Sequence, residues 1–335
     1  MLTKTNDKPE PAAKSILRKK STFTFLKIAV ALLVLLVLVR KISLREIELA
    51  FATANRMYLI AAALALAANL YLQFKKWQLL VRLEKKSATN SEIFISLMSG
   101  YTLGFITPGR IGEFGRGIFI SQTRMARLLG LTVIDKLCSL IMIYIFGVLG
   151  FAYFLKQQVH FLFYLPVFIT GLLISAALLL LFLKVDRFRI VFHRLIKRWK
   201  RYEKIDELFI SLENISANKK ARLLFWAFCQ TLTYIGQFYL LLKAFTPQAG
   251  WLSLLAIAST LFAKTLLPIS FGDLGIRESA AVFFFGKLGI PAGAAFNASF
   301  TLFIINILFP SMIGLVFILR NRLLVTSKNH NNAQR

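Results

Sequence analysis

The sequence predicts an all-α polytopic membrane protein with about six full transmembrane helices and two re-entrant helical hairpins in an inverted-repeat arrangement. Three observations support this fold class. The chain of 335 residues is 57% hydrophobic, yet its formal net charge is +27. Apolar runs of roughly 20 residues, the length that crosses a bilayer, alternate with blocks of Lys and Arg. A motif of Pro, Gly, an acid and Arg occurs twice, and both copies interrupt apolar stretches where charge is expensive.

Six segments are predicted to cross the membrane because each is apolar and long enough. They are 23–39, 57–74, 128–154, 160–183, 223–245 and 293–319. Residues 1–22 form a basic tail without a small-residue cleavage site before the first span, which is therefore interpreted as a signal anchor. With a second basic tail at 321–335, the positive-inside rule predicts a membrane domain at 23–320 and cytoplasmic termini.

Three charged stretches are predicted to lie outside the bilayer. Residues 40–56 and 184–222 have apolar positions at helical spacing among many charges, which is typical of amphipathic helices on the membrane surface. The second of these carries 12 Lys or Arg and 5 acids and is predicted to be cytoplasmic. Residues 75–90, with five basic residues and one acid, are predicted to be a cytoplasmic connection.

The two remaining apolar stretches contain the motif copies and are predicted to be re-entrant hairpins. Residues 91–127 carry four arginines, so the positive-inside rule favours entry and exit at the cytoplasm, with a turn at Pro108-Gly109. No basic cluster divides residues 251–290, which favours a hairpin that enters from outside. Opposed broken helices in the two halves of a chain are typical of transport sites.

The motif begins with Pro108-Gly109-Arg110-Ile111-Gly112-Glu113 and recurs 160 positions later as Pro268-Ile269-Ser270-Phe271-Gly272-Asp273. Both copies continue through an apolar residue and Gly to Arg, which directly follows Gly115 in the first copy and comes one residue later, after Ile276, in the second. Because Pro and Gly break helices and allow close backbone approach, their positions are predicted to be hinges. The predicted hinge residues are Pro108, Gly109, Gly112, Gly115, Pro268, Gly272 and Gly275.

In the first copy, Arg110, Glu113 and Arg116 are spaced by three, so a helix starting near Pro108 would carry them on one face. Arginine grips phosphate with paired donors, and the helix N-terminus would add free N–H groups. These three residues are therefore predicted to bind a substrate with an anionic headgroup. A structural ion-pair cluster at the hairpin tip, or an ordinary cytoplasmic turn, would produce the same pattern.

The second copy supplies Arg277 and Glu278, which are predicted to line the same site. Asp273 and Lys264 are further candidates, since the lysine could neutralise an acid or meet a phosphate. An i,i+4 salt bridge between Asp273 and Arg277 in an outward-facing turn is the alternative.

Asp135 and Lys136 lie inside the span 128–154 and are also candidate site residues. Neighbouring residues on a helix point about 100° apart, so at least one should find a partner elsewhere, such as Arg110, Arg116 or Glu113. A span that starts later would instead place both at the interface. The asparagines of the apolar spans, Asn69, Asn297 and Asn306, are predicted to form interhelical hydrogen bonds rather than to bind a ligand.

Several function classes lack support in the sequence. There is no nucleotide-binding G-x-x-x-x-G-K-[ST] motif, and none of the three histidines has metal-ligand spacing. The five aspartates are never adjacent or one apart, and Cys138 and Cys229 fall inside apolar spans. No nucleic-acid-binding module is present, and the basic residues lie beside apolar spans as in lipid-facing loops. We therefore expect no enzyme activity, metal, cofactor or nucleic-acid partner.

The string Thr107 to Glu113, together with Pro268 to Glu278, resembles the lysylphosphatidylglycerol synthase transmembrane region, a family of flippase-like integral membrane proteins. The resemblance implies movement of a lipid between leaflets of a bacterial or archaeal plasma membrane. Two-part members append an aminoacyl-transfer domain, whereas 16 residues follow Leu319 here, so no synthase activity is expected. Asp273 stands where family members commonly have a second glycine.

The leading hypothesis is therefore a flippase for a phosphate-bearing lipid, aminoacylated or polyprenyl-linked. Arg110, Arg116 and Arg277 would hold the phosphate, while Glu113, Asp273 and Glu278 would meet a cationic group or a proton. One alternative is a non-catalytic membrane partner of a separate lipid-modifying enzyme. The other is a membrane-embedded transferase acting on a lipid phosphate, with Glu113 or Asp135 as base.

Overall fold

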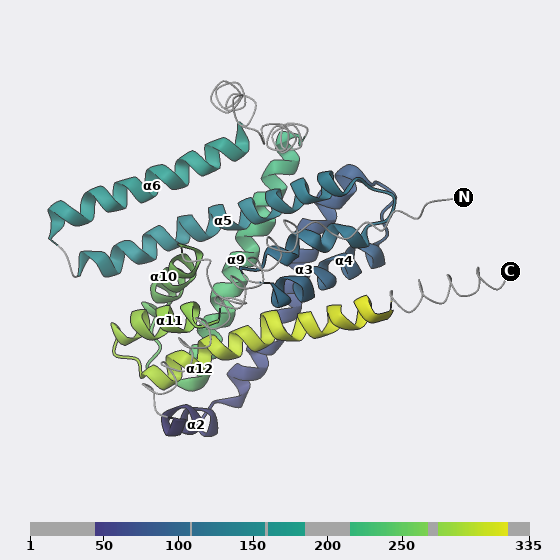
Figure 1. Ribbon diagram of the computed structural model, residues 1–335. Helices are drawn as coiled ribbons and strands as arrows, with labels where there is room; N and C mark the ends of the chain where they lie inside the picture. Colours follow the sequence, from purple (N-terminus) through teal and green to yellow (C-terminus); the bar gives the residue numbers. More distant parts are fainter. Residues whose placement is uncertain (1–43, 108, 158–159, 185–214, 267–273, 321–335) are drawn as a thin grey trace, which may run out of the picture.

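The computed structural model describes residues 44–107, 109–157, 160–184, 215–266 and 274–320, and all regular elements in these ranges are helical (Figure 1). The elements are α2 (Leu44–Ala52), α3 (Arg56–Glu84), α4 (Asn90–Ile106), the 3₁₀ helix η1 (Ile111–Phe119), α5 (Met125–Lys156), α6 (Phe161–Leu183), α9 (Ala217–Phe245), α10 (Ser253–Leu266), α11 (Ile276–Gly286), α12 (Ala292–Phe303) and the π-helical turn η2 (Ile304–Leu308). Helix continues after η2 to Arg320.

Four helices in the described ranges are long and apolar enough to cross a membrane: Arg56–Glu84, Arg127–Lys156, Tyr164–Leu183 and Ala292–Arg320. They coincide with four of the predicted spans, at 57–74, 128–154, 160–183 and 293–319. The predicted span 223–245 lies within α9, which has 29 residues but carries more polar side chains. The predicted span 23–39 lies outside the described residues, as do both predicted tails.

Two predicted boundaries are wrong. The helix of the predicted span 57–74 does not end there: residues 75–84 continue α3, and their side chains Trp77, Leu80 and Val81 are fully buried against neighbouring helices. Residues 217–222, assigned from the sequence to a surface helix, are the first turns of α9. The rest of that predicted surface helix, residues 185–214, is outside the described chain. Within the other predicted surface segment, 40–56, α2 is helical as expected.

Helices α4 and η1 form an antiparallel hairpin. The α4 glycines allow the close approach, since a Cβ on Gly100 would lie 2.9 Å from Cβ of Arg116, and one on Gly104 would lie 2.4 Å from Cγ of Glu113. The chain reverses at Gly109 and Arg110, which both have left-handed backbone angles, with φ of 61° and 57°. A turn at this place was predicted from the sequence, although Pro108 itself is outside the described residues.

The hairpin begins and ends at the same end of the molecule. The backbone N–H of Ser121, after η1, donates to Oε1 of Glu92 in the first turn of α4 at 2.7 Å. Lys85 donates to the same carboxylate at 2.8 Å, and Arg127 of α5 pairs with Glu84 of α3 at 2.8 Å. The segment from α4 to η1 therefore leaves this end and returns to it.

Helices α10 and α11 lie in contact with each other (Figure 1). The residues that join them, 267–273, include Pro268, Gly272 and Asp273 and are outside the described chain. Helix α10 packs closely on α5 at Gly150. A Cβ added at this glycine would lie only 2.5 Å from the carbonyl oxygen of Leu255. Gly275 has a φ of 86°, which suits glycine, and α11 begins directly after it.

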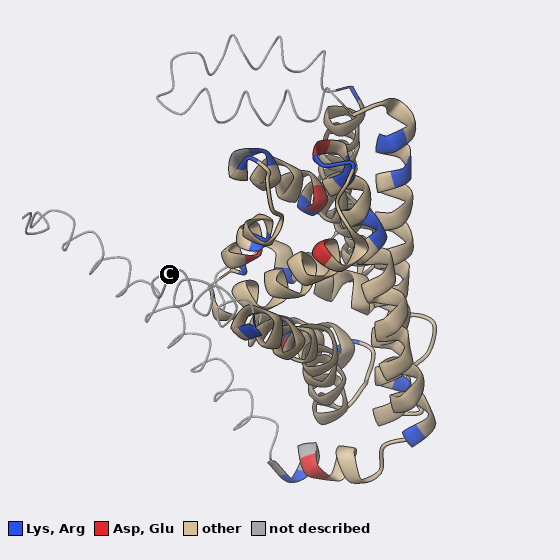
Figure 2. Cartoon of the chain, turned by 90° about the vertical axis from the view of Figure 1, so that its right-hand side faces the viewer, with Lys and Arg blue, Asp and Glu red and all other residues tan. Residues whose placement is uncertain are grey.

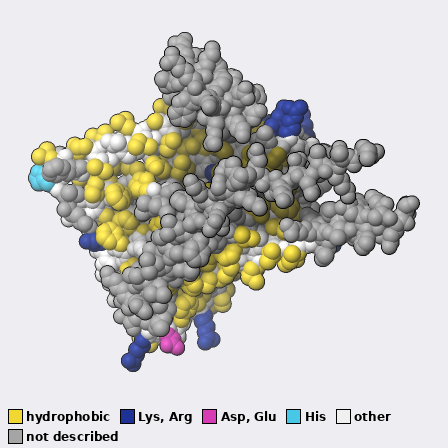
Figure 3. All heavy atoms as spheres, in the orientation of Figure 1, with side chains coloured by type: hydrophobic (Ala, Val, Ile, Leu, Met, Phe, Trp, Pro, Cys, Tyr) yellow, Lys and Arg dark blue, Asp and Glu magenta, His cyan; other side chains and the backbone are white. Residues whose placement is uncertain are grey.

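Two hydrophobic cores hold the helices together. One is built mainly from α9 to α12 and includes Phe238 and Phe285, whose ring centroids are 5.6 Å apart. The other joins the C-terminal half of α3 to α4, α5 and α9 around Trp77 and Leu97. On the face shown in Figure 3, hydrophobic side chains cover much of the described surface and Lys and Arg lie mostly near its edges. Such a surface suits a protein surrounded by lipid.

Candidate functional site

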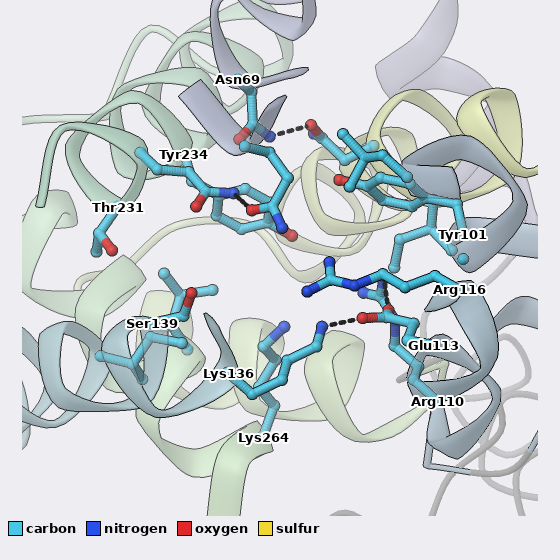
Figure 4. A pocket seen from close by; sticks show the side chains of 18 residues that line it. Asn69, Tyr101, Arg110, Glu113, Arg116, Lys136, Ser139, Thr231, Tyr234 and Lys264 are labelled. Atoms are coloured by element: carbon cyan, nitrogen blue, oxygen red, sulfur yellow. Dashed lines mark hydrogen bonds and ion pairs between the residues drawn. The ribbon is translucent and has the colours of Figure 1, made fainter. Parts of the chain in front are cut away.

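A cavity of about 150 Å³ lies where residues of both cores and of the α4–η1 hairpin meet (Figure 4). Its walls come from α3, α4, η1, α5, α9, α10 and η2. The charged residues at the walls are Arg110, Glu113, Arg116, Lys136 and Lys264. The polar uncharged and aromatic residues are Asn69, Gln73, Tyr101, Ser139, Gln230, Thr231, Tyr234 and Asn306. In the cartoon of Figure 2, several acidic positions of the described chain lie near basic positions.

The local fold of the hairpin places Arg110, Glu113 and Arg116 of the first motif copy at the cavity wall. A 3₁₀ helix has about three residues per turn, so Glu113 and Arg116 fall on one face of η1 and both are buried. Gly112 lies against the backbone of α4 and donates its N–H to Oγ1 of Thr107 at 2.6 Å. The shared face was predicted, but the helix begins at Ile111, and Arg110 precedes it.

Arg116 is at the centre of a buried ion cluster. Its Nη2 donates to Oδ2 of Asp135 at 2.9 Å, and its guanidinium carbon lies 3.5 Å from the ring centroid of Trp77. Lys76 of α3 pairs with the other carboxylate oxygen of Asp135 at 3.0 Å. These three charged side chains are at most 2% exposed. Their short contacts to one another indicate that the cluster fastens η1 to α3 and α5.

Uncharged groups complete this cluster. Lys76 also donates to Oγ of Ser139 at 2.6 Å and to Oε1 of Gln230 at 2.9 Å. Gln73 donates to Oδ2 of Asp135 at 3.1 Å. With a carboxylate and two neutral acceptors around it, the Lys76 ammonium is a structural cation rather than one that awaits a ligand.

A second ion cluster opens toward the cavity. Glu113 of η1 pairs with Arg110 through one carboxylate oxygen and with Lys136 of α5 through the other. The Arg110 side chain is 21% exposed and the Lys136 side chain is 40% exposed, while Glu113 is 7% exposed. Two cations thus share one carboxylate, and both cations are more exposed than the acid.

Lys264 adds a further cation from α10. Its ammonium lies 5.9 Å from the ring centroid of Tyr234, and the side chain is partly buried. Figure 4 shows Lys136 and Lys264 pointing from neighbouring helices toward the same part of the cavity. Among the described residues that line the cavity, four are cations and one is an acid.

Amide side chains form the opposite part of the wall. Asn69 of α3 donates to Oδ1 of Asn306 at 2.7 Å, and Asn306 donates to Oε1 of Gln237 at 2.8 Å. Asn306 lies in the π-helical turn η2, four residues before Pro310. Because proline has no N–H, Pro310 cannot donate the helical hydrogen bond to the carbonyl of Asn306. Asn69 and Asn306 form the interhelical hydrogen bond that the sequence predicted, and both also line the cavity.

The described residues Gly275 to Arg277 of the second motif copy, and the adjacent Glu278, are not among those that line this cavity. Arg277 and Glu278 are fully buried and pair with each other at 2.6 Å, and Arg277 also donates to Oγ of Ser299 at 3.0 Å. The backbone N–H of Gly275 donates to Glu278 at 2.7 Å, so this carboxylate caps the start of α11. The described geometry therefore separates these two residues from the Arg110 group, in contrast to the expected single lining. A role for Arg277 and Glu278 in binding stays a prediction.

The cavity also confirms one expectation and reveals residues that the sequence reasoning missed. Asp135 pairs with Arg116 and Lys136 pairs with Glu113, as expected for charges inside an apolar span. Lys76 was missed because a dense basic stretch indicated a cytoplasmic loop. The spacing of Asn69, Gln73 and Lys76 on one face of α3 was the available signal. Lys76 itself does not line the cavity; the polar and aromatic wall residues that the sequence did not single out are Gln73, Tyr101, Ser139, Gln230, Thr231 and Tyr234.

Within the described ranges, no group of His, Cys, Asp and Glu side chains has the arrangement of a metal site. Comparison with known proteins gives one family. The pattern of the family described as "Lysylphosphatidylglycerol synthase TM region" matches residues 24–314. No curated protein and no solved structure matches the chain. Because the match covers most of the sequence and the described fold is helical with apolar spans, the chain belongs to the lysylphosphatidylglycerol synthase transmembrane region family.

Proposed function

We propose that this protein moves a phosphate-bearing lipid between the leaflets of the membrane, with the lipid headgroup held in the cavity. The observation that carries the proposal is the set of cations at the cavity wall. Arg110, Lys136 and Lys264 line the cavity, and Glu113 is the acid among the described wall residues. Membership of a family related to lipid synthesis and flipping supports the same function.

The excess positive charge favours an anionic ligand. A charged side chain at membrane depth costs at least about 2.5 kcal/mol on insertion scales, and the described wall residues include four cations and one acid, which favours an anionic ligand. Arg110 can offer paired donors to phosphate oxygens, and Lys136 and Lys264 can act as point charges. Arg116 and Lys76 hold Asp135 and support the wall. Arg110, Lys136 and Lys264 are therefore our proposed phosphate ligands.

The α4–η1 hairpin offers a way for the lipid tails to remain in the bilayer. On the side of η1 away from the cavity, Ile111 is 65% exposed and Ile118 is 67% exposed. Large apolar side chains exposed on this hairpin suit contact with acyl chains. We propose that this hairpin enters the membrane from the cytoplasm without crossing it, and that α10 and α11 form its counterpart from the other side.

A reconstitution experiment tests the proposal. Full-length protein is placed in vesicles that contain fluorescent phosphatidylglycerol, and an impermeant reductant measures the fraction of label in the outer leaflet over time. We expect the protein to equilibrate the label between leaflets. Lys136→Gln with Lys264→Gln should slow this at least about tenfold, because two point charges on the headgroup are lost.

The matched control removes the same charge elsewhere. Lys156 and Lys287 are exposed and do not line the cavity, so Lys156→Gln with Lys287→Gln should flip at the wild-type rate. If both double variants slow the flipping rate equally, the rate depends on the net charge of the protein and not on the lysines at the cavity. A wild-type protein that leaves the label on its original leaflet would overturn the proposal and favour a binding partner of a lipid-modifying enzyme. Recovery of chemically altered lipid would favour the transferase alternative.

A further inference from the structure

The cavity wall has two chemically different parts. Lys136, Lys264 and Glu113 lie together, and Asn69 lies on the opposite side in Figure 4. The charged part suits a phosphate, because Arg offers paired donors and Lys a point charge to its oxygens. The second part is built from amide groups of three helical segments and is uncharged. A headgroup that consists of phosphate alone would leave this amide part without a partner.

The hydrogen bonds between the amides fix which atom of Asn69 is left over. Gln237 donates to the backbone carbonyl of Ala62 at 2.8 Å, and a carbonyl can only accept. Gln237 must therefore accept from Asn306, which in turn must accept from Asn69. This order assigns the amide nitrogen of Asn69 to Asn306 and leaves Oδ1 of Asn69 as an acceptor.

That acceptor has no hydrogen-bond donor among the residues that the structure describes. Oδ1 of Asn69 is buried at the cavity wall without a partner, and the residue is 4% exposed. A buried polar atom that is left unpaired is costly, so such an atom at a cavity wall points to a group that the ligand supplies. Nε of Arg110 is likewise buried without an acceptor in the described chain. The ligand should thus bring an acceptor to Arg110 and a hydrogen-bond donor to Asn69.

Two kinds of donor are common in lipid headgroups, a hydroxyl and an ammonium. An ammonium would enter a cavity where four described wall residues are cations. The acid at the wall, Glu113, already pairs with both Arg110 and Lys136, and like charges in one site disfavour binding strongly. A hydroxyl provides the donor without adding charge, and amide side chains suit hydroxyl ligands because they both donate and accept.

We infer that the cavity binds a phosphate headgroup that carries hydroxyls and no cationic group, such as a glycerol phosphate or a sugar phosphate. The phosphate lies against Arg110, Lys136 and Lys264, and a hydroxyl donates to Oδ1 of Asn69. This inference rests on the proposed function and names its substrate class. An aminoacylated headgroup, with an added ammonium, is excluded by the charge of the wall.

Binding of short-chain lipids to the detergent-solubilised full chain tests the hydroxyl contact. Dihexanoylphosphatidylglycerol and dihexanoylphosphatidylpropanol have the same phosphate and charge, but the second lacks the headgroup hydroxyls. Wild-type protein should bind the glycerol lipid about threefold to tenfold more tightly, the range of one neutral hydrogen bond. Asn69→Leu should abolish this preference, because the acceptor for the headgroup hydroxyl is lost.

Gln237→Leu is the matched control for a merely structural effect. It removes a buried amide from the same chain of hydrogen bonds, but Gln237 does not line the cavity. We expect this variant to lose stability and keep the preference for glycerol. The inference is overturned if both variants lose the preference equally, or if the wild-type protein has none.

Lysylphosphatidylglycerol separates the inference from the proposed function. Wild-type protein should bind its dihexanoyl form at least about tenfold more weakly than the unmodified lipid, because like charges would meet. Tighter binding and faster flipping of the lysyl lipid would overturn the inference and leave the flippase function intact. Wild-type protein that binds the glycerol lipid preferentially but moves neither lipid would overturn the flippase function and support the assigned headgroup. Soluble glycerol 3-phosphate that competes as well as the lipid would show that the lipid chains add nothing.

Discussion

The guanidinium of Arg116 lies over the indole ring of Trp77, with 3.5 Å between the guanidinium carbon and the ring centroid. The two residues are also connected through Ser96, which accepts from Nε1 of Trp77 at 3.2 Å and donates to the carbonyl of Arg116 at 2.8 Å. This arrangement joins α3, α4 and η1 beside the cavity, which Arg116 lines. The other cations among the described wall residues are Arg110, Lys136 and Lys264.

The contact predicts that Arg116→Lys is not a conservative change. Lysine keeps the charge but loses the planar group that stacks on Trp77 and donates to Asp135. We expect a loss of about 2 kcal/mol in the free energy of unfolding, the value of a desolvated cation–π contact. Denaturant unfolding of the solubilised protein measures it. Trp77→Leu should make Arg116→Lys much less costly, and additive losses from the two substitutions would contradict a direct coupling.

A second prediction concerns the close packing of the hairpin. Gly112→Ala would place a Cβ 2.0 Å from the carbonyl oxygen of Leu103, which is backbone and cannot rotate away. Overpacking of this kind costs typically about 1–3 kcal/mol, and we expect the upper part of that range. Gly236→Ala in α9 is the control because no atom lies within 4 Å of its added Cβ. Thermal unfolding should show a loss for Gly112→Ala alone.

The sequence predicted the elements well where one physical rule dominated. The length of apolar runs located four membrane helices, and the three-residue spacing of Glu113 and Arg116 located their common face. Charges inside an apolar span must find partners, and Asp135 did pair with Arg116. These inferences depend on local patterns, which the chain carries within a few turns of helix.

Contacts between distant segments could not be predicted in the same way. The positive-inside rule predicted that Lys76 lies in a cytoplasmic connection. Its side chain is instead buried in α3, where Asp135, Ser139 and Gln230 surround the ammonium group. The repeated motif also suggested one common site. A repeat fixes similar local turns but not the distance between its copies, and Arg277 pairs with the adjacent Glu278.

The third prediction is an acid-sensitive contact at the base of the hairpin. Burial raises the pKa of Glu92, but hydrogen bonds from Lys85 and from Ser121 lower it further, so the pKa lies below its usual value of 4.5. The folded state thus favours the ionised carboxylate. Its stabilisation is fully present above about pH 4.5 and is lost as the pH falls through the lowered pKa of the folded state.

Glu92→Gln should therefore flatten the pH dependence of stability in this range. The measurement is the midpoint of thermal unfolding of the solubilised protein between about pH 3 and pH 6. Glu48→Gln changes an exposed carboxyl of α2 that contacts neither Lys85 nor Ser121, and should keep the wild-type profile. A profile of Glu92→Gln that falls as steeply as the wild type would contradict the role of this carboxylate.

The last prediction is that the α4–η1 hairpin leaves and returns to one side of the membrane. Lys86 precedes α4, Arg124 follows η1, and both are exposed, while Glu92 holds the two ends of the hairpin together. Single cysteines at these two positions, in a chain without Cys138 and Cys229, should react with an impermeant maleimide from the same side.

Helix α3 connects this end of the molecule to the end where Asn55 donates to the carbonyl of Ala244 at 2.8 Å. A cysteine at the exposed Gln248, just after α9, should therefore react from the opposite side. Labelling of positions 86 and 124 from opposite sides would mean that the segment between them crosses the bilayer, and it would remove the re-entrant hairpin from the proposed route of the lipid.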